Sequence, residues 1–336
     1  MKTFRPKTIY YEKEILDYES GKHIFDKYQG QDIEFIEIEN HNNIPCLRQE
    51  PDKNFPKLKR NLILGVRKSL RPVPNQKTSD FLMPYTSSGC SAMCIYCYLV
   101  CTYFKCSYLR VFVNREKMID SIIKRTLKEN RKIVYEIGSN SDLVMENMVS
   151  DNLPWTIEQF ARIPNAYATL PTKFHQIDSI LELDHKGKTT VRMSLNPSII
   201  IDKYEIGTSS LNERMEAIEK LWQSGYKIGI LIAPVILVDR WRDMYHELFT
   251  YMRNKLSKDL LKDTTIEVIL MTYGYAHRQI NEAAFRPELQ LYDDKQMTGR
   301  GRGKYCYKQD IRECAKEFIS KELNEILPMS NVAYIV

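Results

Sequence analysis

Three cysteines stand close together in an order that suits a bound metal centre. Cys90, Cys94 and Cys97 form the spacing C-x-x-x-C-x-x-C. Three thiolates in one loop can hold one face of an iron–sulfur cubane and leave the fourth iron open to a substrate or cofactor. A structural zinc ion takes four ligands, so a zinc site would have to recruit Cys101 or Cys106. The third interpretation, three unrelated buried cysteines, would not require the tyrosines that flank the last of them.

The composition is that of a folded, soluble chain. Of 336 residues, 43% are apolar and 27% are charged, with a formal charge of +6. These values exclude a disordered or collagen-like protein. Five of the eight cysteines fall between residues 90 and 106, which favours metal or redox chemistry over a disulfide framework. No apolar stretch is long enough to span a bilayer and no signal segment is evident, so we expect a cytoplasmic protein without membrane contact.

Alternating strand and helix patterns follow residue 62. The expected strands are Leu62–Val66, Ile133–Ile137, Ala166–Leu170, Thr190–Leu195, Ile228–Ile232 and Ile266–Met271. The expected helices between and after them are Glu116–Asn130, Ile157–Arg162, Phe174–Leu183, Ser210–Ser224 and Trp241–Leu256. This alternation predicts βαβ units and a parallel sheet, either open or curled into a complete or partial barrel.

Polar residues stand where several of these strands end. They are the segment 139–142, Lys173, Ser194 and the break at Ala233 and Pro234. Neither G-x-G-x-x-G nor a P-loop follows the early strands. Because barrel enzymes carry their function at the carboxyl ends of the strands, we expect these residues to face one site.

The stretch from residue 298 to 307 interleaves glycine, basic and aromatic residues. Arg300, Arg302 and Lys304 suit phosphate contacts, and Tyr305 offers a face for base stacking. A surface hairpin whose charges are merely solvated is an equally good interpretation of this motif alone.

The cysteine spacing, with an aromatic residue just before the third cysteine, resembles the signature of radical S-adenosylmethionine (SAM) enzymes. Further blocks resemble the spore photoproduct lyase family, in one order from the first residues to about residue 307. They are Phe4-x-Pro6-Lys7-x-x-Tyr10, Leu64-Gly65-Val66-Arg67, Tyr96-Cys97-Tyr98-Leu99, Tyr108-Leu109-Arg110-Val111-Phe112-Val113-Asn114, Ser141-Asp142-Leu143-Val144, Thr172-Lys173-Phe174, Gly207-Thr208-Ser209-Ser210, Gly225-Tyr226-Lys227-x-Gly229 and Gly303-Lys304-Tyr305.

This resemblance implies a fold and its division. The fold is α/β, a partial (β/α)6 barrel of the TIM type, with an N-terminal extension and a C-terminal β-hairpin. The expected parts are an extension over residues 1–60, the radical SAM barrel over 61–290, and a DNA-contacting hairpin and helix over 291–336.

The resemblance also implies a reaction and its cofactors. Such enzymes split the thymine dimer 5-thyminyl-5,6-dihydrothymine of spore DNA into two thymines, with a 4Fe-4S cluster on the three cysteines and SAM on its open iron. By resemblance, Ser141, Lys173, Ser194 and Ala233 hold SAM. The lesion in damaged DNA would be flipped into the barrel mouth, with Arg300, Arg302, Lys304 and Tyr305 as the clamp.

The implied surroundings are those of a spore enzyme. We expect a monomer in the cytoplasm of the spore core or germinating spore, active in DNA repair. Its electron donor would be a flavodoxin or ferredoxin.

One position departs from the family pattern. Where the best-known members have the cysteine that returns a hydrogen atom to the product radical, this chain has Ser139, whose O–H bond is too strong for that step. Another thiol, at Cys101, Cys106 or Cys306, could replace it, and Cys101 is the first choice. Tyr96 or Tyr98 could instead deliver the atom. A family paralogue with another nucleic acid or small-molecule substrate, or a non-catalytic module with a structural metal, are the remaining hypotheses.

Overall fold

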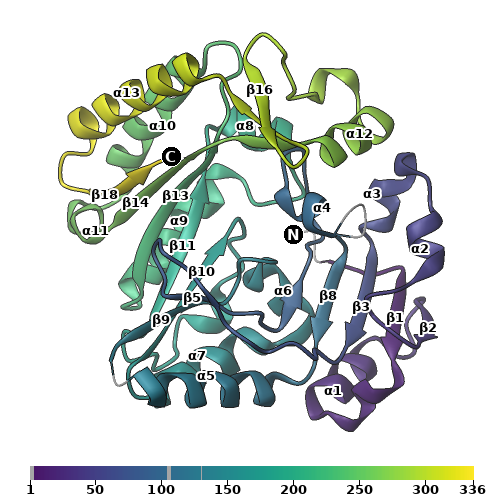
Figure 1. Ribbon diagram of the computed structural model, residues 1–336. Coiled ribbons are helices and arrows are strands. Elements are labelled where there is room, and N and C mark those ends of the chain that lie inside the picture. Colours follow the sequence, from purple (N-terminus) through teal and green to yellow (C-terminus); the bar gives the residue numbers. More distant parts are fainter. Residues whose placement is uncertain (1–3, 104–106, 130) are drawn as a thin grey trace.

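Two curved sheets lie side by side in the computed structural model, which describes residues 4–103, 107–129 and 131–336 and gives the backbone alone for residues 101–103 (Figure 1). The larger sheet has eight strands in the order β18-β14-β13-β11-β10-β9-β5-β4. Along the chain they are β4 (Val73–Pro74), β5 (Phe81–Leu82), β9 (Ile133–Glu136), β10 (Ala166–Thr172), β11 (Thr189–Leu195), β13 (Lys227–Val235), β14 (Thr265–Leu270) and β18 (Asn331–Ile335).

The larger sheet is a curled half-barrel. All of its pairings are parallel except that of β4 with β5. Its central strands β10, β11 and β13 are almost continuously buried, as expected for a parallel sheet covered on both faces. The expected partial barrel is thereby confirmed. All six expected strands are present, five in this sheet and the first, as β3 (Asn61–Gly65), in the smaller one.

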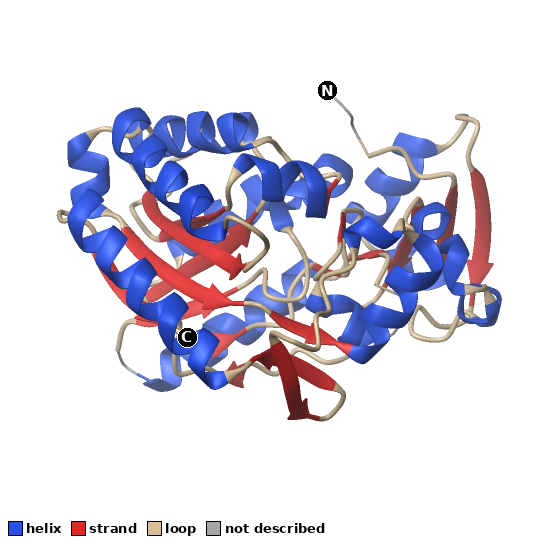
Figure 2. Cartoon of the chain, turned by 90° about the horizontal axis from the view of Figure 1, so that it is seen from above, coloured by secondary structure: helices blue, strands red, loops and turns tan. Residues whose placement is uncertain are grey.

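Helices cover the outside of the half-barrel, and the strands lie on its inside (Figure 2). Side chains cap the starts of some of them. Asp142 accepts from the backbone of Val144 and Met145 at α6, and Ser210 forms a capping box with Glu213 at α9. The helices are α5 (Arg115–Glu129), α6 (Leu143–Ser150), α7 (Asn152–Arg162), α8 (Ser198–Tyr204), α9 (Leu211–Gln223), α10 (Trp241–Lys255), α11 (Lys258–Asp263) and α13 (Gln309–Ile326).

The smaller sheet forms a layer beside the half-barrel, with the order β2-β1-β3-β8-β6. Its strands are β1 (Thr8–Glu12), β2 (Glu34–Ile38), β3, β6 (Ser87–Ser88) and β8 (Leu109–Phe112), and its helices are α1 (Glu19–Tyr28), α2 (Pro45–Gln49) and α3 (Phe55–Leu58). Thus β3 and β8 pair with the N-terminal strands, whereas β18 near the C-terminus closes the larger sheet. The expected boundaries at residues 60 and 290 stay predictions.

A hairpin lies beyond the half-barrel. It consists of β16 (Met297–Gly301) and β17 (Lys304–Tyr307), and β17 also pairs with β15 (Thr272–Gly274). Helix α12 (Tyr275–Ala284) follows β15 directly and lies beside the hairpin in Figure 1.

The expected helix over Phe174–Leu183 is wrong, because the structure has only a short 3-10 turn at Asp178–Ile180. Side chains take up the backbone N–H groups that would begin the helix. Thr172 Oγ1 accepts from the Phe174 amide at 3.0 Å, and Ser209 Oγ accepts from the His175 amide at 3.0 Å. The Lys173 carbonyl, which would accept from Ile177 in a helix, accepts instead from the amide of the distant Ser209 at 3.1 Å, so the chain follows an irregular course past the end of β10.

Candidate active site

The cysteine loop is held between the two sheets. It leaves β6 of the smaller sheet at Gly89, whose amide donates to the Asn140 carbonyl beyond β9 at 2.8 Å. Gly89 has φ +75°, and a Cβ there would lie 1.9 Å from the Tyr108 carbonyl oxygen, so this position requires glycine. Further on, β7 (Met93–Cys94) forms a separate two-stranded sheet with β12 (Glu205–Ile206), which follows α8. The loop is therefore fixed at its start and at Cys94.

One cavity of about 590 Å³ brings the predicted catalytic groups together. This volume falls within the range of small-molecule sites. Its lining includes all three motif cysteines, both flanking tyrosines, the serine at the missing-thiol position and all four predicted SAM residues: Cys90, Cys94, Cys97, Tyr96, Tyr98, Ser139, Ser141, Lys173, Ser194 and Ala233. The sequence motifs therefore converge on one site at the carboxyl ends of the strands.

The cysteines suit a cluster better than a single ion. Among the described residues, no group of three or more His, Cys, Asp or Glu side chains could hold one metal ion. A cubane does not need such a group, since each cysteine binds a different iron. Burial raises the pKa of the Cys90 thiol to about 12, so this thiol becomes a thiolate only with a strong compensating cation. The zinc hypothesis depends on Cys101 or Cys106 as the fourth ligand, and the side chains of both lie outside the described residues.

The predicted SAM residues are joined by hydrogen bonds. The Lys173 ammonium donates to Ser194 Oγ at 2.6 Å, to Glu205 Oε1 at 2.9 Å and to the Ala233 carbonyl at 3.2 Å. These three bonds use all the N–H donors of an ammonium group. Ser141 Oγ lies 2.6 Å from the Oγ of Ser87, which is in β6 just before the cysteine loop.

Glu205 is the acidic centre of this network, and the sequence motifs did not reveal it. Its fully buried carboxylate accepts from Arg214 at 2.6 Å, from Asn196 at 3.0 Å, and from the Tyr96 hydroxyl. Burial would raise the pKa of the Glu205 carboxyl, but the charges of Arg214 and Lys173 and the hydrogen bonds lower it far below its ordinary value. Glu205 is therefore ionised at neutral pH.

The two tyrosines differ in their surroundings. Tyr96 is buried, and its hydroxyl is committed to Glu205 beside Lys173. Tyr98 begins α4 (Tyr98–Tyr103) and remains 57% exposed on the wall of the cavity. Cys101 lies in the same helix, but its side chain is outside the described residues, as is all of Cys106. Cys306 is buried in β17 and does not line the cavity.

A second ionic network lines the cavity and closes the open side of the half-barrel. Arg192 on β11 pairs with Glu267 on β14 at 3.1 Å and with Glu136 on β9. Thr78, in the turn between β4 and β5, donates to Glu267 Oε2 at 3.3 Å, and the Tyr334 hydroxyl on β18 donates to the same carboxylate. The turn thus connects the two ends of the sheet.

The predicted DNA-binding residues lie away from this cavity, on the hairpin. Arg300, Arg302 and Lys304 are exposed, whereas Tyr305 is partly buried with its ring 4.7 Å from that of Tyr292. The exposed aromatic ring beside the hairpin belongs to Tyr275, which is 51% exposed and whose amide donates to the Gly303 carbonyl at 2.8 Å.

A half-barrel with three spaced cysteines at the carboxyl ends of its strands is the architecture of a radical SAM enzyme. A family model described as spore photoproduct lyase matches residues 4–336. Spore photoproduct lyase of Bacillus subtilis (strain 168) is 30% identical, with 98% of each chain covered, and that of Clostridium acetobutylicum is 29% identical, again with 98% of each covered. The chain therefore belongs to the spore photoproduct lyase family.

Solved structures agree with this assignment. A spore photoproduct lyase complexed with dinucleoside spore photoproduct has a TM-score of 0.91 and 28% identity, with both chains fully covered. A mutant spore photoproduct lyase with bound SAM and dinucleoside spore photoproduct gives the same values. Family membership makes this chain a radical SAM lyase of DNA repair, with a 4Fe-4S cluster and SAM as its cofactors. Among the described helices, none has the length and apolar character needed to cross a bilayer.

Proposed function

We propose that the cysteine cavity reverts 5-thyminyl-5,6-dihydrothymine in DNA to two thymines. The observation that carries this assignment is the common cavity, which is lined by the cluster cysteines, the SAM candidates and two tyrosines. When bound, the cluster and SAM supply the 5′-deoxyadenosyl radical that takes a hydrogen atom from C6 of the lesion. The protein's own task is to orient the cofactor and lesion, to exclude water and to return a hydrogen atom to the product.

The SAM residues would act as one hydrogen-bonded group. Lys173 can bind the cofactor's carboxylate only by releasing one of its three present partners. We expect it to release the Ala233 carbonyl, which is the most distant of them at 3.2 Å. This carbonyl then becomes available to the amino group of adenine, while Ser194 and Ser141 offer hydroxyl groups for the remaining polar atoms.

Tyr98 is the proposed hydrogen-atom donor. Among the described residues that line the cavity, the thiols are the three cluster ligands, and Ser139 offers only a strong O–H bond. The product radical gains the hydrogen atom of the Tyr98 hydroxyl, which leaves a neutral tyrosyl radical. Tyr96 would restore Tyr98 with its own hydrogen atom, and 5′-deoxyadenosine, which carries the atom first removed from the lesion, would restore Tyr96. The carbon radical so formed would rejoin methionine as SAM and return one electron to the cluster, so no external reductant is consumed. Cys101 is the alternative donor.

The hairpin is the proposed contact with duplex DNA. Arg300, Arg302 and Lys304 would neutralise phosphates, and a flipped lesion would reach the cavity. Tyr305 would shape the hairpin through its contact with Tyr292 and provide a second aromatic surface. Tyr275 offers the more exposed ring on which a neighbouring base can stack.

The remaining proposals concern the cellular setting. We propose a monomer in the cytoplasm of the spore core or germinating spore, supplied with electrons by a flavodoxin or ferredoxin. Size-exclusion chromatography with light scattering tests the monomer, and cluster reduction by each purified electron carrier tests the donor.

Turnover of the synthetic dinucleotide lesion tests the assignment. Reduced, reconstituted protein is incubated with SAM and the dinucleotide, and the products are separated by chromatography. We expect thymine dinucleotide together with SAM-dependent changes in the EPR spectrum of the reduced cluster. SAM cleavage without any thymine dinucleotide would instead favour a paralogue with another substrate.

A further inference from the structure

Lys59 is a buried lysine that ties the cysteine loop to the smaller sheet. It follows α3 and precedes β3, and only 2% of the residue is exposed. Its ammonium donates to the Cys90 carbonyl at 2.9 Å, to the Ser107 carbonyl at 2.9 Å and to the Ser107 hydroxyl at 3.0 Å. All three N–H donors are therefore used on the start of the loop and on the segment that follows it.

The three hydrogen-bond partners of the Lys59 ammonium are neutral, and no carboxylate in the described part of the chain is among them. Burial lowers the pKa of this lysine, and the three nearby cysteines, Cys97, Cys90 and Cys94, oppose that shift. A buried ammonium without an anion is costly. The position of Lys59 therefore favours an anionic group bound to the cysteine loop.

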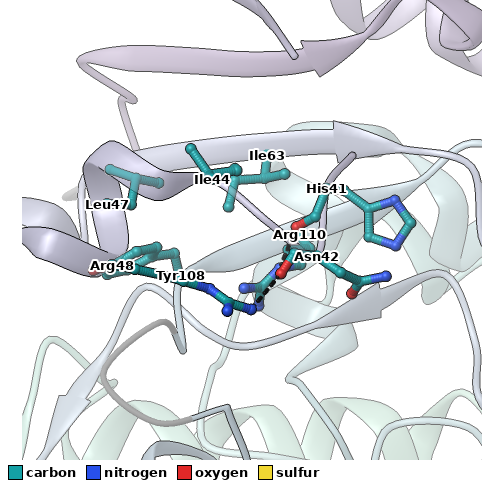
Figure 3. Close-up of a pocket in the computed structure, with 8 residues that line it drawn as sticks. All are labelled: His41, Asn42, Ile44, Leu47, Arg48, Ile63, Tyr108 and Arg110. Atoms are coloured by element: carbon teal, nitrogen blue, oxygen red, sulfur yellow. Dashed lines mark hydrogen bonds between the residues drawn. The ribbon is translucent and has the colours of Figure 1, made fainter. Parts of the chain in front are cut away.

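A second buried cation, Arg110, lies near Lys59 and increases the need for a negative charge. Arg110, on β8 of the same layer, is 7% exposed and opposes the protonation of Lys59. Figure 3 shows Arg110 with His41, to whose carbonyl its Nε donates at 3.3 Å, around a cavity of about 10 Å³ that has room for one water molecule at most. Among the described residues, the acidic groups that act on the charge of Lys59 are the thiols of Cys97, Cys90 and Cys94.

We propose that Lys59 provides the counter-charge for the iron–sulfur cluster on Cys90, Cys94 and Cys97 and thereby raises its reduction potential. This proposal rests on the proposed function only in that the three cysteines bind the cluster, and it is independent of the substrate. Reduction adds a negative charge to the cluster. A nearby cation in a low-dielectric environment stabilises the reduced form more than the oxidised form. Because Lys59 is buried, salt screens this effect little.

The test is a redox titration of the reconstituted holoenzyme, followed by EPR in the absence of SAM and lesion. The neutral variants are Lys59→Met and Lys59→Gln, and Lys59→Arg retains the charge. The matched control is Lys188→Met, since Lys188 also donates to two backbone carbonyls, those of Ala161 and Ile163, on the outside of the half-barrel.

We expect both neutral variants to show at least a tenfold smaller ratio of reduced to oxidised cluster at a fixed potential, which for one electron is a shift of about 59 mV to more negative values. Lys59→Arg and Lys188→Met should keep the wild-type potential. Failure of both neutral variants to load a cluster, with normal loading of these two, would also support a required charge. A wild-type potential in either neutral variant, or a failure of Lys59→Arg to load, would overturn the proposal.

Discussion

Lys173, which lines the cavity, forms an ion pair of 2.9 Å with Glu205, and the backbone of Glu205 is paired with that of Cys94 in the cysteine loop. One residue thus connects the loop that would hold the cluster with the lysine that would hold SAM. Arg214, which is fully buried, fixes the second oxygen of the same carboxylate. We therefore expect changes at Glu205 to affect SAM binding even though Glu205 belongs to no sequence motif.

Replacement of Glu205 by glutamine should weaken SAM binding about tenfold or more, because a hydrogen bond to a charged group contributes about 1.5–3 kcal/mol. Titration of the EPR signal of the reduced cluster with SAM measures this affinity. The effect should disappear when Glu205→Gln is combined with Lys173→Met, because Glu205 acts through that lysine. Glu216→Gln, at an exposed position of α9, is the control. An undiminished effect in the double variant would show that Glu205 acts by another route.

The same carboxylate should make the protein sensitive to acid. The pKa of Glu205 in the folded protein lies far below its ordinary value of 4.5. Its contribution to the free energy of unfolding is therefore full above pH of about 4.5 and is lost as the pH falls toward the folded-state pKa. Urea unfolding at several pH values between 3 and 7 should show a steeper loss of stability for the wild type than for Glu205→Gln. Parallel curves would contradict this assignment.

A thiol introduced at residue 139 should take over hydrogen donation. In Tyr98→Phe we expect the yield of intact thymine dinucleotide to fall at least about tenfold while SAM is still cleaved, because the cavity loses its proposed donor. The added change Ser139→Cys should restore most of that yield. Product analysis by chromatography and mass spectrometry measures both. If Cys101→Ala, rather than Tyr98→Phe, diverts the product radical to side products, Cys101 is the donor.

The hairpin should matter for duplex DNA and not for the isolated dinucleotide. Each of Arg302→Ala and Lys304→Ala should reduce the slope of log affinity against log salt concentration by about one, which corresponds to the loss of one phosphate contact. Tyr275→Ala should weaken binding about 5-fold to 150-fold, since stacking on an aromatic ring contributes about 1–3 kcal/mol per base. Fluorescence anisotropy with a lesion-containing duplex measures these effects, with Arg162→Ala on α7 as the control. Equal losses of dinucleotide turnover would indicate damage to the fold instead.

Much of the site could be predicted because its residues occur in short local patterns. Cys90, Cys94 and Cys97 are neighbours in sequence, and Lys173 and Ser194 follow buried strands, whose carboxyl ends meet at one edge of a parallel sheet. The alternation of strands and helices predicted the parallel sheet, and the family resemblance implied that this sheet curls into a partial barrel. These features depend on spacing and periodicity, which the sequence displays directly.

The residues that were missed depend on long-range contacts. Arg214 occurs in a helix with charges opposite its apolar face, yet it is fully buried, because it meets Glu205 from another element. In the sequence, Lys59 looks like any other lysine of a basic stretch. Only the fold shows that it donates to Cys90 and Ser107. The error at Phe174–Leu183 has a similar cause, since distant Ser209 accepts from the backbone there. No local pattern reports such partners.

A single turnover in D₂O tests the central claim most directly. Reduced holoenzyme, SAM and the dinucleotide lesion are mixed in D₂O, and the thymine dinucleotide is examined by mass spectrometry. Because a phenolic hydrogen exchanges with solvent, we predict intact thymine dinucleotide with one deuterium in a methyl group, and loss of that product in Tyr98→Phe. Undeuterated product from the wild type, or unchanged deuterated product from Tyr98→Phe, would contradict the account.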